Sequence, residues 1–436
     1  MMKKILAVLL AAVSMVATLA FTACGDRGGN ASDPSTLVVW IQSTSQPQFF
    51  SWAKQQYEAQ HPGVTINVQI QQSGALGDTL DVTLGTSGAP DMTATWGGLI
   101  VSKLVSGNKV LNLNDVVEEA VGDNMHAAAQ YNKLDGDGEY YSIPLNGFIS
   151  PVIYYNATLF SQYGIEAPET YEDLISISNT IRSRGKQPLV AGFSTWHLPH
   201  FMQAVHARTM APEDFEQLMG IKEDMNPFEL DGFKEGWDFF KDMGEQGIFA
   251  DNITGYDANT AATEFTSGNA LMYTAPSTDL PTLVEAATFD IGTFLLPAAP
   301  QEFLPEGLTT ADMADVTLAS GVYSDVFVID AKTTKAELAK DFAKFLLSVE
   351  AQSYLLECEM LPVRTDVSLD RASPILAPVI EEMSNGVSGF YQNFSVTGLD
   401  IQLLNAGVSL LSGDIDSTTA AKQIATFYHD SAMVVA

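Results

Sequence analysis

One segment, Tyr140–Asn156, constrains the fold more than any other part of the sequence. It opens as a short strand and ends in Val152–Tyr155, a β-branched and aromatic run that predicts a buried strand. The Pro, Asn and Gly residues between them cannot continue regular structure. A second α/β unit begins near Ala167, so the segment predicts a crossing between two lobes. We expect the ligand to bind between those lobes.

The start of the folded chain and its length support the same architecture. Leu37–Ile41 predicts a buried strand, Gln46–Gln60 an amphipathic helix, and the alternating residues Val64–Ile70 a second strand. This order is a βαβ unit, which requires a parallel sheet. Because the 436 residues exceed the ~250–300 that one core supports, two lobes are expected on size alone. The predicted fold class is α/β, with two lobes, mixed sheets and a cleft between them.

The first 23 residues have the order of a secretory signal, with basic Lys3 and Lys4 before the apolar run Ile5–Leu19. Cys24 follows small residues and resembles the cysteine of a bacterial lipobox, although Phe21 stands where Leu is usual. We expect Cys24 to be lipidated and residues 24–35 to form a flexible tether. The alternative is a plain signal peptide. The apolar run is shorter than the ~20 residues that span a bilayer.

Charge and cysteine content narrow the classes of partner. Removal of the two lysines lowers 21 basic residues to 19, against 53 acidic residues, for a net charge of −34. Such a surface repels nucleic acid and acidic lipid headgroups, so we expect no nucleic-acid partner and a small neutral or cationic ligand. With Cys24 lipidated, only Cys358 remains, which excludes an intramolecular disulfide and predicts a small core residue.

Several short motifs occur in order along the chain. They are Trp40, Tyr57 with His61–Val64, Gly88–Asp91, Asp137–Pro144, Tyr154–Asn156, Pro168–Leu174, Phe265–Met272, Gly292–Pro297 and Leu361–Arg364. Together they resemble the extracellular solute-binding proteins of ABC importers, in particular the maltose-binding protein-like carbohydrate group. In Pro168–Leu174, Thr170 predicts a helix N-cap with Asp173 as its capping-box partner. Further helices are expected near 79–84, 233–244, 336–347, 375–383, 399–411 and 418–428.

The resemblance implies a type II binding-protein fold with about three hinge crossings. One lobe would comprise residues 36–146 and 321–368, and the other residues 147–320 and 369–436. It also implies a monomer on the outer face of the cytoplasmic membrane, or in the periplasm if the organism has an outer membrane. The protein would capture a sugar or oligosaccharide and deliver it to the permease subunits of an ABC transporter by hinge closure.

Sugar recognition needs flat apolar faces and fixed polar groups, which guides the choice of candidate binding residues. Gln42, Ser43 and Gln46 follow the first strand, where parallel sheets place ligands, although helix capping would equally explain them. The remaining candidates, placed by the family layout, are Trp96, Asn146, Phe148, Trp196, His197, Ser277, Asp279, Tyr391 and Asn393. A stacking Trp common in relatives near Ser277 is missing. Trp40, Trp52 and Trp237 are most simply core or interface residues.

Other kinds of chemistry find weak support. Pro199 interrupts His197 and His200, with His206 nearby, and no carboxylate or cysteine cluster accompanies them, so we expect no metal site. Asp135–Glu139 departs from a calcium loop and predicts a hairpin turn. No nucleotide-binding, cofactor or catalytic motif is present, so no cofactor and no enzyme activity are expected. A polyamine or other cation as ligand, a glycan-hydrolysing lipoprotein and a sensor lipoprotein stay open as alternatives.

Overall fold

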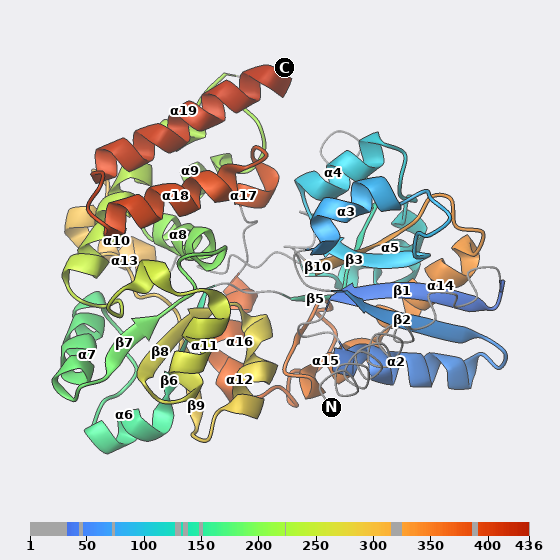
Figure 1. Ribbon diagram of the computed structural model, residues 1–436, viewed down its shortest axis with the longest axis horizontal. Helices are drawn as coiled ribbons and strands as arrows, with labels where there is room; N and C mark the ends of the chain where they lie inside the picture. The colour runs from blue at the N-terminus through green and yellow to red at the C-terminus, as the bar shows by residue number, and fades with distance from the viewer. Residues whose placement is uncertain are drawn as a thin grey trace, which may run out of the picture.

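Two lobes lie side by side in the computed structural model (Figure 1). It describes residues 33–42, 47–71, 75–126, 132–133, 138–147, 151–222, 224–314, 325–385 and 391–435. The expected signal peptide, Cys24 and most of the tether lie outside these residues. Each lobe has its own open sheet and its own cluster of buried apolar side chains, which confirms the α/β class and the two cores expected from the length.

Lobe 1 is built on a sheet with the order β2-β1-β3-β10-β4. The central strands are parallel, with β1 next to both β2 and β3, whereas β10 returns antiparallel to β3 and β4. The predicted βαβ unit is therefore confirmed. The strands are β1 (Thr36–Gln42), β2 (Thr65–Gln71), β3 (Met92–Trp96), β4 (Ile143–Pro144) and β10 (Asp325–Ile329).

The helices of lobe 1 pack through apolar and aromatic side chains, and one buried ion pair lies among them. Trp52 of α2 stacks on Tyr354 of α15 with ring centroids 4.3 Å apart. The Lys335 ammonium forms a buried ion pair with Asp91, whose carboxylate also accepts the backbone N–H of Val38 at 2.8 Å. The lobe 1 helices are α2 (Pro47–Gln60), α3 (Ala75–Thr83), α4 (Leu99–Ser106), α5 (Asn114–Ala120), α14 (Ala336–Leu346) and α15 (Val349–Glu357).

Lobe 2 has a second mixed sheet, with the order β7-β8-β6-β9. Strands β7 and β8 are parallel, and β6 runs antiparallel to both β8 and β9. The strands are β6 (Val152–Asn156), β7 (Gln187–Val190), β8 (Ala270–Ala275) and β9 (Ile291–Phe294). All six residues of β8 are buried, which agrees with helices covering both faces of the sheet (Figure 1).

The helices of lobe 2 include the capping box that the sequence predicts. The Thr170 hydroxyl accepts the N–H of Asp173 at 3.1 Å, and the Asp173 carboxylate accepts the N–H of Thr170 at 3.0 Å. The helices are α6 (Ala157–Tyr163), α7 (Tyr171–Ser183), α8 (His197–Ala207), α9 (Pro212–Gln217), α10 (Phe233–Glu245), α11 (Ala258–Thr266), α12 (Leu280–Ala286), α13 (Thr310–Ala314), α16 (Ala377–Asn385), α17 (Tyr391–Phe394), α18 (Leu399–Leu411) and α19 (Ser417–Val435).

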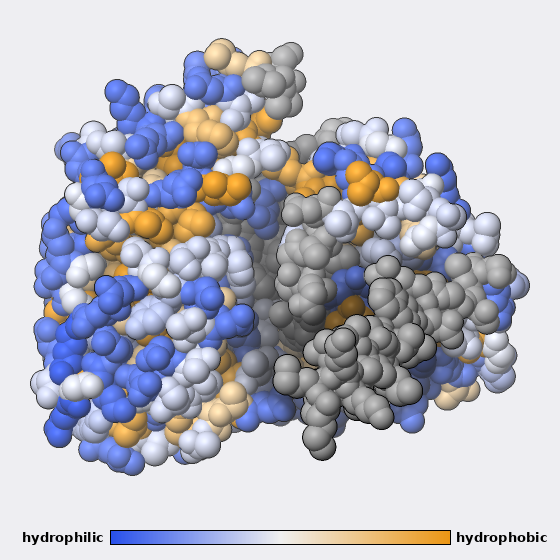
Figure 2. All heavy atoms as spheres, in the orientation of Figure 1, coloured by the Kyte–Doolittle hydropathy of each residue, from blue (hydrophilic) through white to orange (hydrophobic). Residues whose placement is uncertain are grey.

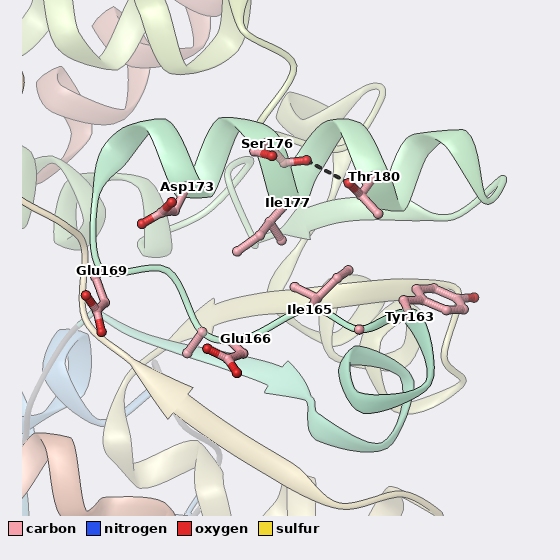
Figure 3. Close-up of a pocket in the computed structure, with 10 residues that line it drawn as sticks. Tyr163, Ile165, Glu166, Glu169, Asp173, Ser176, Ile177 and Thr180 are labelled. Carbon is pink, nitrogen blue, oxygen red and sulfur yellow. Dashed lines mark hydrogen bonds between the residues drawn. The ribbon is translucent and has the colours of Figure 1, made fainter.

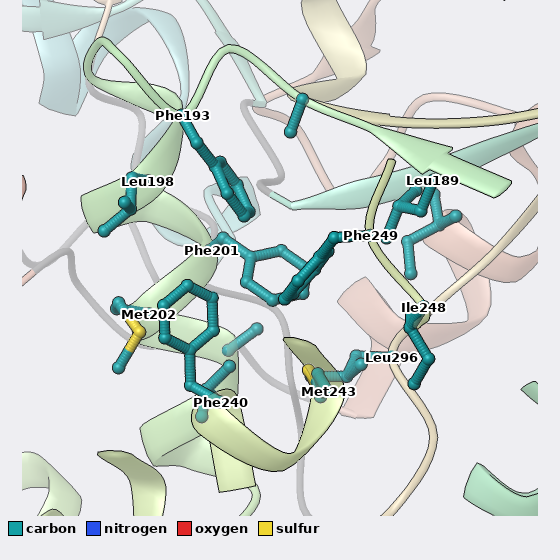
Figure 4. Packing of buried hydrophobic residues seen from close by; sticks show 14 of the residues in the cluster. Leu189, Phe193, Leu198, Phe201, Met202, Phe240, Met243, Ile248, Phe249 and Leu296 are labelled. Atoms are coloured by element: carbon teal, nitrogen blue, oxygen red, sulfur yellow. The ribbon is translucent and has the colours of Figure 1, made fainter. Parts of the chain in front are cut away.

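An aromatic cluster holds α8 and α10 against the end of β7 (Figure 4). The Phe193 ring lies 5.4 Å from Phe201 and 5.3 Å from Phe249, and Phe240 lies 5.5 Å from Phe249. Phe193 belongs to the segment that leaves β7, so this packing fixes the backbone just before Trp196. The core therefore sets the position of a residue that the sequence assigns to ligand binding.

Short hinge strands connect the two lobes. Strand β5 (Asn146–Gly147) pairs antiparallel with β11 (Leu361–Pro362). The buried side chain of Gln352 ties these segments together, because its Nε2–H donates to the Leu145 carbonyl and its Oε1 accepts the Val363 N–H. The expected crossing near residues 320 and 321 lies outside the described residues, so the lobe boundaries stay a proposal.

The surface combines hydrophilic regions with one apolar region. Figure 2 shows hydrophilic residues over most of lobe 2 on the visible face, with apolar residues gathered over α18 and α19. Two of the apolar side chains there, Ile401 and Met433, are exposed. Within the part of the chain that the structure describes, no helix combines the length and the apolar character required to cross a membrane.

Candidate functional site

In lobe 1, the candidate residues lie where parallel strands end. Strands β1 and β3 are parallel, so their last residues, Gln42 and Trp96, lie at the same edge of the sheet. Trp96 is half-buried and pairs with Asp325, the first residue of β10. Ser43 and Gln46, which were expected beside Gln42, lie outside the described residues.

Lobe 2 presents the corresponding edge of its own sheet. The parallel strands β7 and β8 lead directly into the segments that carry Trp196, Ser277 and Asp279. Strand β6 begins at this edge, because Val152 pairs with Ala275 in the antiparallel register. The crossing from lobe 1 therefore enters lobe 2 beside the residues that follow β8.

The register of the strands places these two edges next to the same crossing. Val326 of β10 pairs with Thr95 on one side and with Pro144 on the other, so the chain leaves lobe 1 beside the end of β3. From residue 147 to residue 151 an extended chain spans at most about 14 Å. Candidate residues from both lobes therefore converge on the hinge. Asn146 lies in this crossing, whereas Phe148 falls outside the described residues.

Trp196 is the most exposed aromatic side chain at the lobe 2 edge, with 44% of its surface accessible. Its ring centroid lies 4.1 Å from that of His197 and 4.9 Å from that of His200, both on α8. Burial lowers the pKa of His197 to about 3, so the imidazole is neutral. The Gly192 N–H donates to its Nδ1 at 3.3 Å, which places the ring proton on Nε2. The tryptophan thus rests on a fixed, uncharged support.

Asp279 supplies a carboxylate at the same edge. It follows β8 in a short 3-10 turn and accepts a hydrogen bond from the Tyr273 hydroxyl at 3.0 Å. The Tyr154 hydroxyl donates to the Pro276 carbonyl at 2.9 Å and so anchors the start of the turn. Burial raises the pKa of Asp279 to about 6, and the hydrogen bond from Tyr273 partly offsets this rise by stabilising the ionised form. Ser277, between these anchors, is buried.

Several buried polar atoms at the two edges have no hydrogen-bond partner within the described part of the chain. They are Thr95 Oγ1, Ser142 Oγ, Asn146 Oδ1, His197 Nε2 and Thr274 Oγ1. An unpaired buried polar atom destabilises a fold by about 1–3 kcal/mol, so in native proteins such atoms form hydrogen bonds with water or a ligand. Their positions beside the hinge and the strand ends indicate a hydrated, ligand-accepting region.

The structure does not bring Tyr391 to this edge. Its ring is fully buried in lobe 2, its hydroxyl hydrogen-bonds His206 Nδ1 at 3.1 Å, and its N–H donates to Gln203. His206 lies ten residues after Trp196 on α8, which places Tyr391 about 15 Å along the helix from the tryptophan. The family layout suggested a substitute for the missing stacking residue here, but packing of α8 against α17 explains Tyr391. Asn393, on the same short helix, is half-buried.

Sequence reasoning missed the tyrosine that organises the lobe 2 edge. Tyr273 lies in the middle of the buried strand β8, where apolar neighbours suggest packing alone. Its hydroxyl nevertheless orients Asp279, and its ring lies 6.1 Å from that of His197. The alternation of residues along the strand places Tyr273 but cannot show that its hydroxyl reaches a carboxylate beyond the strand end. By contrast, the predicted core positions of Trp237 and Cys358 are confirmed, and burial raises the pKa of the Cys358 thiol to about 12.

A separate pocket of about 470 Å³ lies on the outer side of lobe 2, between α7 and the loop after α6 (Figures 1 and 3). Glu166, Glu169 and Asp173 line it, and Asp173 already serves the capping box with Thr170. It is far from the strand ends that face lobe 1 in Figure 1, so we do not assign the ligand to it. Among the described residues, no cluster of three His, Cys, Asp or Glu side chains suits a metal ion.

The fold has two lobes, and the converging strand ends place the candidate ligand region at the hinge between them. The sequence matches the family described as bacterial extracellular solute-binding protein over residues 52–377. This match covers most of the chain, which therefore belongs to that family.

Individual relatives agree with this assignment. An uncharacterized ABC transporter extracellular-binding protein of Pyrococcus horikoshii is 22% identical, with 97% of this chain and 95% of the relative covered. The multiple sugar-binding protein of Streptococcus mutans is 27% identical over 56% of each chain. The solved structure of the bacterial solute receptor AcbH superimposes on this chain with a TM-score of 0.77 at 17% identity; that receptor is described as having an exclusive preference for β-D-galactopyranose. That comparison covers 92% of this chain and 99% of the receptor.

Proposed function

We propose that this protein captures a sugar or oligosaccharide between its lobes and delivers it to an ABC transporter permease. The observation that carries the proposal is the convergence of Trp96 and Trp196, one from each lobe, on the two sheet edges joined by the hinge. Flat aromatic faces suit the C–H surfaces of sugars, and the polar atoms around them suit hydroxyl groups. The sugar-binding relatives support the same class of ligand.

Binding is coupled to closure of the lobes in this proposal. A ligand that contacts both edges stabilises the closed arrangement by the difference between its affinities for the closed and open forms. The hinge strands β5 and β11 are only two residues long each, so a small change in backbone angles can reorient one lobe relative to the other. The permease would then recognise the closed form.

We also propose that Cys24 is lipidated and that residues 24–35 tether a monomer to the outer face of the membrane. The order of basic, apolar and small residues before Cys24 supports this, as does membership of an extracellular family. Expression of the full chain in a bacterial host, followed by mass spectrometry of the membrane fraction, tests the anchor. Cys24→Ser should move the protein out of that fraction, and its retention there would contradict lipidation.

Isothermal titration calorimetry with the mature protein tests the ligand class. The panel includes galactose, raffinose, xylo-, arabino- and chitooligosaccharides, with spermidine as the cationic alternative. For the best-bound sugar, Trp96→Ala and Trp196→Ala should each weaken affinity by about tenfold to a hundredfold, because each removes an aromatic stacking face. Trp52→Phe, which alters a tryptophan packed between α2 and α15, is the matched control and should leave affinity unchanged.

Two further outcomes would contradict the proposal. Tight binding of spermidine without any sugar would favour the cationic ligand that the acidic composition allows. Release of shorter glycans during incubation with an oligosaccharide would indicate a hydrolase instead of a binding protein. Closure itself is measured by small-angle X-ray scattering, in which the bound sugar should reduce the radius of gyration.

A further inference from the structure

Asp279 differs from an ordinary aspartate at the start of a helix. It occupies the N-cap position of α12, where an aspartate usually accepts an N–H of the first helical turn, but its side chain makes no such bond. Its carboxylate turns instead to the Tyr273 hydroxyl at 3.0 Å. One hydrogen bond leaves most of the acceptor capacity of a carboxylate unused, since its two oxygens offer about four lone-pair sites.

No positive group within the described part of the chain neutralises this carboxylate. None of the ion pairs among the described residues includes Asp279. The undescribed stretches beyond residue 32 contain no Lys, Arg or His that could approach it. The His197 imidazole, whose ring lies 6.1 Å from that of Tyr273, is neutral and supplies no positive charge. The raised pKa of Asp279 agrees, because burial causes it and no cation opposes it.

A half-buried carboxylate without a cation imposes a charge requirement on anything that binds beside it. Burial of a second negative charge within about 4–6 Å would be strongly unfavourable, because both ions lose hydration and repel each other. A group with polar hydrogens would instead fill the unused acceptor sites through charge-assisted hydrogen bonds. Vicinal hydroxyls of a neutral sugar and the protonated amine of an amino sugar both have this chemistry.

We propose that Asp279 selects the charge of the ligand, so that the site accepts neutral or amine-bearing saccharides and rejects those that carry a carboxylate or phosphate. This inference rests on the proposed sugar-binding function and adds the class of sugar to it. The Trp196 ring contacts His197, whose ring lies 6.1 Å from that of Tyr273, and the Tyr273 hydroxyl holds Asp279, so one chain of contacts links the stacking face to the acceptor. Tyr273 is a positioning residue, because its hydroxyl holds the carboxylate in place.

The test uses calorimetry at pH 7.5 on matched sugars with the same ring, namely galactose, galactosamine and galacturonic acid, and the corresponding glucose and xylooligosaccharide series. Asp279→Asn removes the charge while its carbonyl oxygen can still accept the Tyr273 hydroxyl. Glu285→Gln is the control, because Glu285 is an exposed carboxylate on the same helix, α12. Tyr273→Phe tests the positioning role, and circular dichroism establishes that each variant is folded.

In the wild type, the acidic sugar should bind at least a hundredfold more weakly than its neutral counterpart. Asp279→Asn should weaken the affinity for neutral sugars about tenfold. It should also reduce the ratio of the affinities for the neutral and the acidic sugar by tenfold or more, whereas Glu285→Gln should preserve both values. A gain in affinity for the amino sugar that Asp279→Asn abolishes would identify the amine as the preferred donor. Tyr273→Phe should weaken neutral sugars about threefold to tenfold without narrowing the gap, because the charge remains.

Equal discrimination by the wild type and Asp279→Asn would overturn the role of Asp279 while leaving sugar binding intact. Tight binding of the acidic sugar by the wild type would do the same. If no saccharide of any charge binds the wild type, the proposed function itself fails, and the two failures are thereby distinguished. If Asp279→Asn does not fold, the wild-type ratio of neutral to acidic sugar still decides the charge requirement.

Discussion

Replacement of Asp279 by Asn should make the unliganded protein more stable at neutral pH. The pKa of this carboxyl is raised from an ordinary value of 3.8 to about 6 by burial. At pH 7.5 the group is ionised in both the folded and the unfolded chain, and the folded chain bears the unfavourable burial of the charge. The difference in pKa corresponds to about 3 kcal/mol of lost stability, since one pKa unit equals about 1.4 kcal/mol.

The sign of the pH dependence follows from proton binding. Between about pH 4 and pH 6 the folded chain keeps a proton on Asp279 that the unfolded chain has released. A rise in pH through this window therefore favours unfolding, and the destabilisation is full above pH 6 and absent below pH 4. Asn carries no charge at any pH, but its amide hydrogens lose water on burial. We therefore expect a net gain of about 2 kcal/mol at pH 7.5 and a loss of about 1 kcal/mol at pH 4, where only the cost of burying the amide remains.

Thermal denaturation followed by circular dichroism measures this effect. For a lobe of this size, the gain corresponds to a rise of about 4–8 °C in melting temperature at pH 7.5. Glu285→Gln, with an exposed carboxylate, should shift the melting temperature by less than about 1 °C at either pH. A shift for Asp279→Asn that is equal at pH 7.5 and pH 4, or absent at pH 7.5, would refute the assignment of an unfavourably buried charge.

Two further pairs of variants test the packing of the lobes. Gly236→Ala should destabilise lobe 2 by about 1–3 kcal/mol in urea unfolding, because its Cβ would lie 2.3 Å from Cδ2 of the His206 ring; Gly255→Ala, which meets nothing within 4 Å, should change it by less than about 0.5 kcal/mol. Equal effects of the two alanines would show that the helix adapts to the extra methyl group. Lys335→Met should destabilise lobe 1 by about 3–5 kcal/mol, because the ammonium and its carboxylate partner are both buried and the partner would lose its counter-charge. Lys344→Met, in an exposed ion pair, should cost less than about 1 kcal/mol, and a similar loss in both would remove burial as the cause.

Local patterns were sufficient to predict most of the fold. The strand β2, the capping box at Thr170 and the bounds of α18 are confirmed, because each depends on neighbours close in sequence. The alternation expected along β2 does not extend to its end, since Ile70 is exposed. One helix end was harder to predict. Helix α19 continues to Val435, beyond the expected end at residue 428, although His429 and Asp430 are exposed and carry no apolar pattern. The local sequence therefore does not show where this helix ends.

The site was predictable only to the level of strand ends. Trp96, Trp196 and Asp279 could be placed at the edges of the two sheets because parallel strands end together. Tyr391 was assigned by its order in the family layout, but its aromatic character serves the packing of α8 and α17 equally well. The bond between Tyr273 and Asp279 joins a strand interior to a turn, and no periodicity encodes such a contact.

The same features that make the unliganded site costly also explain why a ligand can close it. Thr95 in lobe 1 and Thr274 in lobe 2 bear buried hydroxyls with no partner in the described structure, and Asp279 bears a carboxylate with unused acceptor sites. A hydrogen bond from a sugar hydroxyl to such a group releases more free energy than one to a group already paired within the protein, because the buried group is unfavourably unpaired before the ligand binds. The stability that Asp279→Asn should gain is therefore part of the free energy that the wild type can direct into binding. A variant stabilised at this position should bind neutral sugars more weakly for the same physical reason.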